Sequence, residues 1–336
     1  MAGAGRCMLM CPTQERLRRE RERRLHILEV DKHSTTESTD THPRSSEGLA
    51  VKEYVRSAAG CNLSREEWLR PPKVLLATVD YLISVTDRKD HPWWKVYEFV
   101  DDRIRCVRQD LVIQGSEGNE AISILEKCTR FYLYAQYRLC CQRDKFDVKI
   151  NSDQISHCLS SLTHLYKNHS SPSQSEMTGY MLLHNIGSNE TLTSVITSHL
   201  REDPTVKLAL DMNMLYLSRH YIQFFKKLKH LTPLSQCALL IHLDKFKCDC
   251  LKVIENAYGV QNSSLPMSVL SSWLGFNSQV DTQAFLTSLG VPVVGNKVTV
   301  NKRRAPQEVD ANCCQYHVIE QLVDVTQTPS LFLNNS

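Results

Sequence analysis

Apolar residues recur at helical spacing through most of the chain, from about residue 48 to residue 259. Residues three and four positions apart lie on one face of an α-helix, so each such stripe predicts a helix with one buried face. Four stripes follow one another in the first half of this region. Their members are Leu75, Val79, Leu82 and Ile83; Val96, Phe99, Val100, Val107 and Leu111; Ile122, Leu125, Tyr132, Leu133 and Leu139; and Ile155, Leu159, Leu162 and Tyr166.

Two long helices are predicted next, over residues 204–229 and 233–258. Asp203 and Thr232 each stand directly before a proline, and a capping side chain followed by proline is typical of a helix start. Gly259 is placed to end the second helix. Long helices joined by short turns build a bundle or a helical-repeat stack.

The pattern changes after residue 260. We expect a short helix over 265–276, a second over 277–290, and then an alternating hairpin over 291–300 that turns at Gly295 and Asn296. Two helices followed by a hairpin are typical of a winged helix. The predicted fold class is therefore all-α, a helical-repeat (TPR/PCI-like) stack closed by a winged-helix module with one small β-hairpin.

The predicted domain organisation has four parts. Residues 1–47 form a charged helix and a flexible linker, and residues 48–259 form the helical-repeat domain. Residues 260–304 contain the winged helix, and residues 305–336 form a C-terminal tail.

Residues 11–31 are dense in arginine and glutamate. Opposite charges lie four residues apart, as Glu15 and Arg19 do, and each such pair stabilises a helix by about 0.2–0.5 kcal/mol. Two interpretations remain open: a solvated helix whose end packs on the helical body, and an arm that binds RNA. We favour the packed helix, because the pairing neutralises much of the positive charge and charge runs usually face solvent.

Residues 96–111 combine an apolar stripe with closely spaced aspartates and arginines. This density could indicate an active site, but no histidine, cysteine or serine accompanies the charges at a spacing useful for proton or group transfer. We expect ion pairs and hydrogen bonds that fix how neighbouring helices pack.

Composition and motifs restrict the classes of function that we expect. The chain has 336 residues and a formal net charge of +3, which does not by itself require a polyanionic partner. Its 13 cysteines are scattered, and we expect reduced thiols. The sequence contains no C-x-x-C or H-E-x-x-H motif and no Walker loop, so we expect no metal, no cofactor and no enzyme. No apolar run approaches the roughly 18 residues of a membrane span, and we expect no membrane partner.

A basic cluster lies on and after the predicted hairpin. It consists of Lys297, Lys302, Arg303 and Arg304. Such residues can lie along a phosphate backbone, where each neutralised phosphate releases counterions. A solvated turn explains them equally well, and both interpretations stay open.

Five sequence blocks carry a resemblance to a known family. They are MCPTQERLRRERERRLHILEV, AVKEYVRSAAG, LRPPKVLLATVDYL, DDRIRCVRQDL and AISILEKCTRFYLYAQYRL. In this order they resemble the signature blocks of the SAC/GANP family, the scaffold family of the transcription-coupled mRNA export complex. The resemblance covers about residues 10–304. It implies the PCI architecture, a helical stack closed by a winged helix, with no catalytic role in this region.

The resemblance also implies site residues and partners. The partners are a second PCI-domain protein, a small acidic peptide of the DSS type and, on the basic cluster, single-stranded RNA. Tyr132 stands where the family often has histidine, which argues against proton transfer there. The family-motif positions are Cys11, Pro12, Glu15, Arg16, Arg19, Glu20, Leu25, Glu29, Asp102, Arg103, Arg105, Arg108, Gln109, Asp110, Arg130 and Phe131.

The compact layout resembles the short animal members of the family, which are associated with centrosome duplication and spindle progression in mitosis. We therefore expect a non-enzymatic scaffold that acts with centrosomal proteins at the centrosome and spindle and in the nucleus, with the cytoplasm also open. The alternative is an mRNA export adaptor that binds a PCI partner and RNA.

Overall fold

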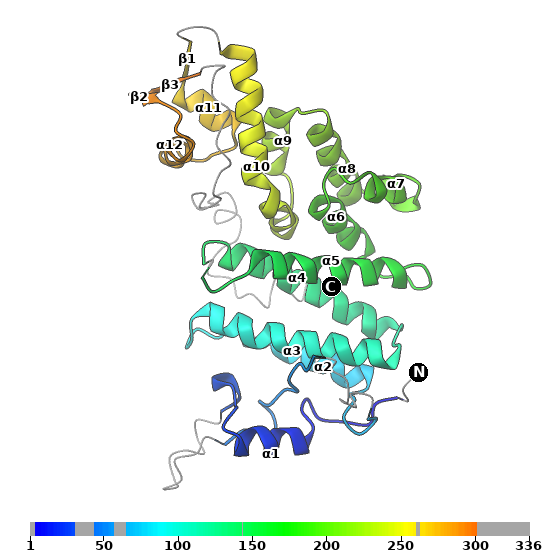
Figure 1. The fold of residues 1–336 in the computed structure, drawn as a ribbon. Coiled ribbons are helices and arrows are strands. Elements are labelled where there is room, and N and C mark those ends of the chain that lie inside the picture. Colours follow the sequence, from blue (N-terminus) through cyan, green and yellow to red (C-terminus); the bar gives the residue numbers. More distant parts are fainter. Residues whose placement is uncertain (1–3, 31–43, 57–64, 143, 260–262, 301–336) are drawn as a thin grey trace. The chain divides into compact units, whose positions relative to one another are not determined.

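The computed structural model describes residues 4–30, 44–56, 65–142, 144–259 and 263–300, which are coloured in Figure 1. The chain forms two compact units. Unit 1 contains the described residues up to Tyr132 together with 157–172, and unit 2 contains the described residues of 133–156 and of 173–300. The division falls inside two helices, so each unit is described by itself.

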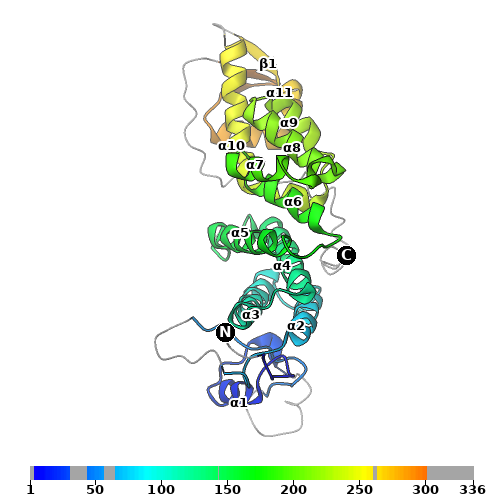
Figure 2. The same cartoon turned by 90° about the vertical axis from the view of Figure 1, so that its right-hand side faces the viewer.

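Unit 1 begins with a charged helix and continues as longer helices. The elements in order are α1 (Thr13–Arg21), the 3-10 helix η1 (Ile27–Glu29), α2 (Pro72–Val85), α3 (Trp93–Gln114), α4 (Asn119–Leu139) and α5 (Val148–Leu165), the last two shared with unit 2. Helices α2 and α3 pack side by side, as Figures 1 and 2 show. The predicted stripes lie in α2 to α5, and all of their members are buried except Tyr166, which is half-buried.

Unit 2 continues the helical stack. Its further elements are α6 (Gln174–His184), α7 (Asn189–Ile196), the 3-10 helix η2 (His199–Glu202), α8 (Pro204–Leu217), α9 (Tyr221–Leu228), α10 (Pro233–Tyr258), β1 (Ser264–Pro266), α11 (Met267–Trp273), α12 (Gln279–Ser288), β2 (Val293–Val294) and β3 (Lys297–Thr299). Helix α6 packs against α8 and α10, and α9 packs against α8, α10 and α11. The described residues thus confirm the predicted helical stack with a small hairpin.

The predicted caps are present. Asp203 accepts hydrogen bonds from the Thr205 and Val206 backbone N–H groups, Thr232 accepts one from Ser235, and Gly259 ends α10. The capping side chains satisfy N–H groups that have no partner inside the helix.

The prediction of one continuous helix over residues 204–229 was wrong. The chain leaves α8 after Leu217 and restarts as α9 at Tyr221. Between them Arg219 adopts a φ of 58°, a left-handed conformation that ends a helix and that residues other than glycine rarely adopt.

The C-terminal module contains the predicted hairpin and one strand more. β2 and β3 pair antiparallel across the Gly295–Asn296 turn, with Val293 opposite Val298. β1 pairs with the other edge of β3, so the strand order is β1-β3-β2. Strand β1 was not predicted, because it is only three residues long and contains a proline. The assignment as a winged helix stays a prediction, and the tail predicted over 305–336 lies outside the described residues.

Candidate functional site: a buried charge network

Helix α1 buries two of its charged side chains. Arg19 is 0% exposed and Glu15 is 3% exposed, and their Nε and Oε1 atoms are 3.5 Å apart. Arg19 Nη2 donates to the Val51 carbonyl oxygen over 2.9 Å and lies 3.2 Å from Cys11 Sγ. Glu15 Oε1 accepts the backbone N–H of Glu53 over 2.8 Å. The predicted packing of this helix against the rest of the chain is confirmed, but two of the charged side chains that we expected to face solvent are buried.

Glu29 lies at the centre of this cluster. Its Oε2 atom is 2.7 Å from Arg19 Nη1 and 3.2 Å from Arg103 Nη2. The carboxylate also accepts the backbone N–H groups of Val51 over 3.0 Å and His26 over 3.2 Å. Glu29 therefore joins α1, η1 and α3 through one fully buried carboxylate, with hydrogen bonds that compensate for its removal from water.

Asp110 forms a second centre, about two turns after Arg103 on the same face of α3. Its Oδ1 atom is 2.8 Å from Lys52 Nζ, and its Oδ2 atom is 2.8 Å from Arg70 Nε. Arg70 Nη2 lies 3.3 Å from Cys106 Sγ. Asp110 and Arg70 are fully buried, and two cations around one anion leave this cluster with net positive charge.

The two centres hold the same short piece of chain, residues 51–55. Val51 is bound at both its N–H and its C=O group, and Lys52 is bound through its side chain. The N–H of Tyr54 donates to Asp102 Oδ2 over 3.1 Å, and Gln109 Nε2 donates to the Val55 carbonyl oxygen over 2.8 Å. Arg105 stacks on the Tyr54 ring at 4.4 Å.

Backbone groups in a protein interior need hydrogen-bond partners. Segment 51–55 belongs to no helix or sheet in the described structure, and its partners are side chains of α1, η1 and α3 together with the Met10 carbonyl oxygen. These charged residues thus hold an irregular segment against α3, whereas we predicted that they would join neighbouring helices.

A third buried group lies deeper in unit 1. Tyr132 donates from its hydroxyl to Asp101 Oδ1 over 3.0 Å, and its ring is fully buried. Burial, and then the charge of Asp101, raises the pKa of Tyr132 well above its ordinary value. Burial alone would lower the pKa of Arg108, but nearby Cys158, Tyr132 and Cys128 raise it instead, so Arg108 stays charged. The tyrosine therefore acts as a protonated hydrogen-bond donor in the core.

The groups of the network keep one protonation state at neutral pH. Burial raises the pKa of Glu29, but the charges of Arg103 and Arg19 outweigh it, and the pKa lies below its ordinary value. Burial raises the pKa of Cys11 and of Cys106 to about 12, so both thiols stay protonated at neutral pH. Neither thiol is the thiolate that nucleophilic chemistry requires.

His26 completes the cluster without a proton-transfer role. Burial, and then the charge of Arg103, lowers its pKa to about 4. Its ring stacks on Phe99 at 4.9 Å, and its Nδ1 atom accepts the N–H of Leu28 over 3.3 Å. The arrangement of neutral thiols, a neutral imidazole and compensated ions stabilises a fold and contains no activated base or nucleophile among these groups.

Other motif positions lie at the edges of the network. Pro12 is the N-cap of α1. Arg16 Nη1 lies 3.4 Å from both the carbonyl oxygen and the hydroxyl of Ser45, and the same hydroxyl donates to Glu20 Oε2 over 3.1 Å. Leu25 is half-buried. These contacts connect α1 with the chain around residue 45.

Arg130 and Phe131 lie on α4, away from segment 51–55. Both are buried, and the Phe131 ring stacks on Tyr97 of α3 at 5.9 Å. They contribute to the packing of α3 against α4.

Sequence reasoning missed Lys52, Arg70 and Cys106 as members of the network. A signal was present: Lys52 interrupts the short apolar run LAV-K, and Arg70 precedes Pro71-Pro72 at the start of α2. Their partner Asp110 lies 58 and 40 residues away, so the pairing could not be read from local spacing.

The basic cluster of the hairpin is described only in part. Lys297 is exposed on β3, where it pairs with Val294 and Pro266 of the flanking strands. Lys302, Arg303 and Arg304 lie outside the described residues. Their role at a nucleic-acid surface stays a prediction.

In the described ranges no three histidine, cysteine, aspartate or glutamate side chains are grouped so that they could hold a metal ion. None of the described helices has the length and apolar character needed to cross a membrane.

Comparison with known proteins places the chain in a family. The SAC3/GANP family matches residues 10–295. SAC3 family protein B of Arabidopsis thaliana is 28% identical over 313 residues, 86% of this chain and 18% of that protein. Protein xmas of Drosophila melanogaster is 27% identical over 315 residues, 87% of this chain and 15% of that protein.

SAC3 family protein 1 of Schizosaccharomyces pombe is 25% identical over 316 residues, which is 86% of this chain and 30% of that protein. The chain thus spans less than a third of each of these relatives. The matched range contains the charge network, α2 to α12 and the first strand of the hairpin. The chain belongs to the SAC3/GANP family, a scaffold family linked to mRNA export.

Proposed function

We propose that this chain is a non-enzymatic, PCI-type scaffold that acts in mRNA export by holding a second PCI-domain protein. The observation that supports a scaffold most is the buried charge network. Its carboxylates, cations and thiols form the hydrogen bonds and ion pairs that hold segment 51–55 in place. They are buried and therefore not accessible to a substrate. The membership of the family supports the link to mRNA export.

The partner surface that we propose is the C-terminal module. Val280 on α12 is 75% exposed and Val294 on β2 is 72% exposed, and α12 packs against β2. Lys297 is exposed one strand away. Exposed apolar side chains beside a cation suit a protein partner that combines apolar anchors with acidic residues. We propose that the partner is a PCI-domain subunit together with a small acidic DSS-type peptide.

Affinity purification of the tagged full chain from dividing cells tests the proposal. A PCI-domain protein should co-purify with the wild type, and Val280→Asp combined with Val294→Asp should remove it. Val112→Asp is the matched control, because Val112 is 80% exposed on α3 of unit 1. Loss of the partner in the control as well, or its retention in the double variant, would contradict the proposed surface.

RNA binding by the basic cluster is the electrostatic part of this proposal. Binding of single-stranded RNA should fall steeply with salt, and charge reversal at Lys302, Arg303 and Arg304 should remove the part of the binding that the basic cluster contributes. Binding that ignores salt would remove RNA from the proposed function.

A role in centrosome duplication and in spindle progression is the alternative function. It rests on the resemblance to the short animal family members. The same purification separates the two, because centrosomal proteins would then co-purify and a fluorescent fusion would mark the centrosome and spindle instead of the nucleus. Recovery of a PCI subunit without centrosomal proteins would favour mRNA export.

A further inference from the structure

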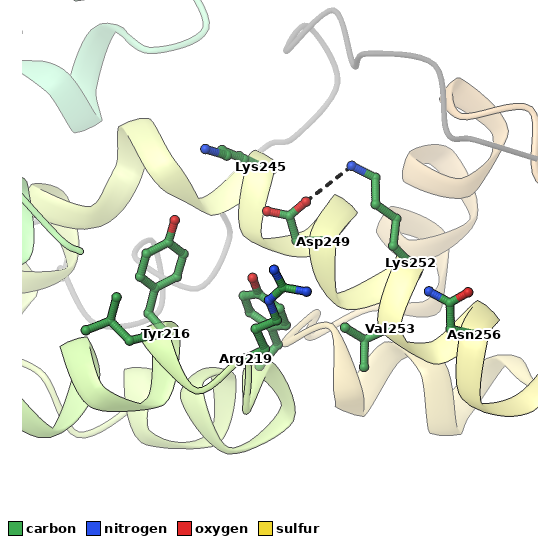
Figure 3. A pocket seen from close by; sticks show the side chains of 9 residues that line it. Tyr216, Arg219, Lys245, Asp249, Lys252, Val253 and Asn256 are labelled. Carbon is green, nitrogen blue, oxygen red and sulfur yellow. Dashed lines mark hydrogen bonds and ion pairs between the residues drawn. The ribbon is translucent and has the colours of Figure 1, made fainter. Parts of the chain in front are cut away.

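A pocket of about 410 Å³ opens in unit 2 between the end of α8, the start of α9 and the second half of α10 (Figure 3). This volume is in the range of small-molecule and nucleotide sites. The pocket belongs to none of the motif positions, and it lies on different elements from the hairpin. Its lining residues are Tyr216, Leu217, Arg219, Tyr221, Lys245, Asp249, Lys252, Val253 and Asn256.

One wall is a tyrosine held in a fixed orientation. One face of the Tyr216 ring stacks on Phe246, with the ring centroids 4.4 Å apart, and this contact fixes the ring against the core. Gly187 lies against its edge, where a Cβ atom would come within 2.6 Å of Tyr216 Cε1. Gly187 has a φ of 83°, so glycine suits this position for two reasons. The ring is therefore preorganised, which lowers the entropy lost when a ligand packs on it.

The charges of the pocket leave two cations uncompensated. Lys252 Nζ lies 3.3 Å from Asp249 Oδ1, the pair marked in Figure 3. The side chains of Arg219 and Lys245 make no hydrogen bond or ion pair with any residue in the described ranges. Arg219 also holds the left-handed backbone conformation noted above. Strained residues concentrate at functional sites, and here the strain places a guanidinium at the pocket.

The remaining polar groups suit hydrogen bonding to a neutral ligand group. Burial, and then the charge of Asp249, raises the pKa of Tyr221 to about 12, so its hydroxyl remains a donor at neutral pH. Asn256 is exposed on α10 and offers both a donor and an acceptor.

We propose that this pocket binds one nucleotide of a single-stranded RNA, with the base against the Tyr216 side of the pocket and the flanking phosphates on Arg219 and Lys245. Proteins bind single strands by combining a basic surface with aromatic rings on which bases stack. An acidic peptide would use the two cations but would leave the Tyr216 ring without a role, so the lining favours RNA.

Fluorescence anisotropy with the full chain and a labelled oligouridine of about 15 nucleotides tests this site. Each phosphate contact on a single strand contributes about 0.7 to the slope of log K against log salt, so Arg219→Ala with Lys245→Ala should lower that slope by about 1.4. An abasic oligomer of the same length should bind at least about fivefold more weakly to the wild type, because it cannot stack. This second comparison needs no variant and so cannot fail through misfolding.

The control is Lys149→Ala with Lys207→Ala. It removes the same charge from exposed positions of unit 2 outside the pocket, and it should leave the slope unchanged. Lys297→Ala weakens RNA binding at the hairpin alone. Comparing it with the Arg219→Ala, Lys245→Ala variant therefore distinguishes a failure of the hairpin surface from a failure of the pocket. Equal effects of the control pair, or equal affinity for RNA and for the abasic oligomer, would overturn the proposal. Displacement of the RNA by polyglutamate with no dependence on bases would assign the pocket to acidic peptides instead.

Discussion

Replacing Glu29 by glutamine tests whether the buried network stabilises unit 1. The substitution keeps the shape of the side chain but removes the anion between Arg19 and Arg103, which are 0% and 4% exposed. Breaking a buried ion pair on one side typically costs about 3–5 kcal/mol, because a charge is left unpaired in the interior. Arg19 keeps its ion pair with Glu15, and Arg103 keeps its ion pair with Asp102, so we expect a loss near the lower end, about 3 kcal/mol.

Urea unfolding followed by tryptophan fluorescence measures this loss. Three of the four tryptophans, Trp68, Trp93 and Trp94, lie in unit 1, so the signal reports mainly on the unit that contains Glu29. A domain typically has a free energy of unfolding of about 5–15 kcal/mol, and the expected change is a large fraction of it.

The matched control is Arg24→Ala. Arg24 also bridges two carboxylates, at 3.0 and 2.6 Å, but its side chain is 52% exposed. Exposed pairs contribute about 0–1 kcal/mol, so this variant should unfold nearly as the wild type does. If Glu29→Gln lost no more than Arg24→Ala, the burial of the network would not stabilise the fold, and the reasoning would be refuted.

Three further predictions follow from single groups. Asp110→Asn should destabilise unit 1 by about 3 kcal/mol in the same assay, since it leaves Lys52 and Arg70 without a counter-ion, and an unchanged midpoint would contradict this. Asp203→Ala should destabilise unit 2 by about 1 kcal/mol in urea unfolding followed by circular dichroism, because α8 loses its cap, whereas Asp203→Asn should restore most of the stability. Burial, and then the charge of His242, lowers the pKa of His184 from 6.5 to about 4. The unfolded chain therefore takes up the proton first, so stability should fall as pH decreases from about 6.5 toward 4, and His184→Gln should flatten that fall in unfolding experiments at a series of pH values.

The helical stack could be predicted because the sequence signals of a helix are local. The stripe of Leu75, Val79 and Leu82 is set by the 3.6-residue period alone, and capping by Asp203 and Thr232 needs only the next few N–H groups. Both signals lie within one or two turns of the chain. For the same reason the hairpin at Gly295 was predictable.

The charge network could not be predicted in the same way. The i, i+4 spacing of Glu15 and Arg19 is the spacing of a solvated pair, and nothing in it indicates burial. Burial follows from residues 51–55, whose backbone needs partners that only the folded chain brings near. The break at Arg219 also could not be predicted, because arginine is a good helix former and its identity does not indicate a left-handed conformation.

Hydrogen–deuterium exchange of α1 tests most directly whether the charged N-terminal segment is part of the scaffold. The amides of residues 16–21, which donate to carbonyl oxygens of the first turns of α1, should be protected in the free protein, should stay equally protected when single-stranded RNA is added, and should lose protection in Glu29→Gln. If these amides exchanged at the rate of an unfolded chain in the free protein and became protected only with RNA, the segment would be an RNA-binding arm and the central claim would be wrong.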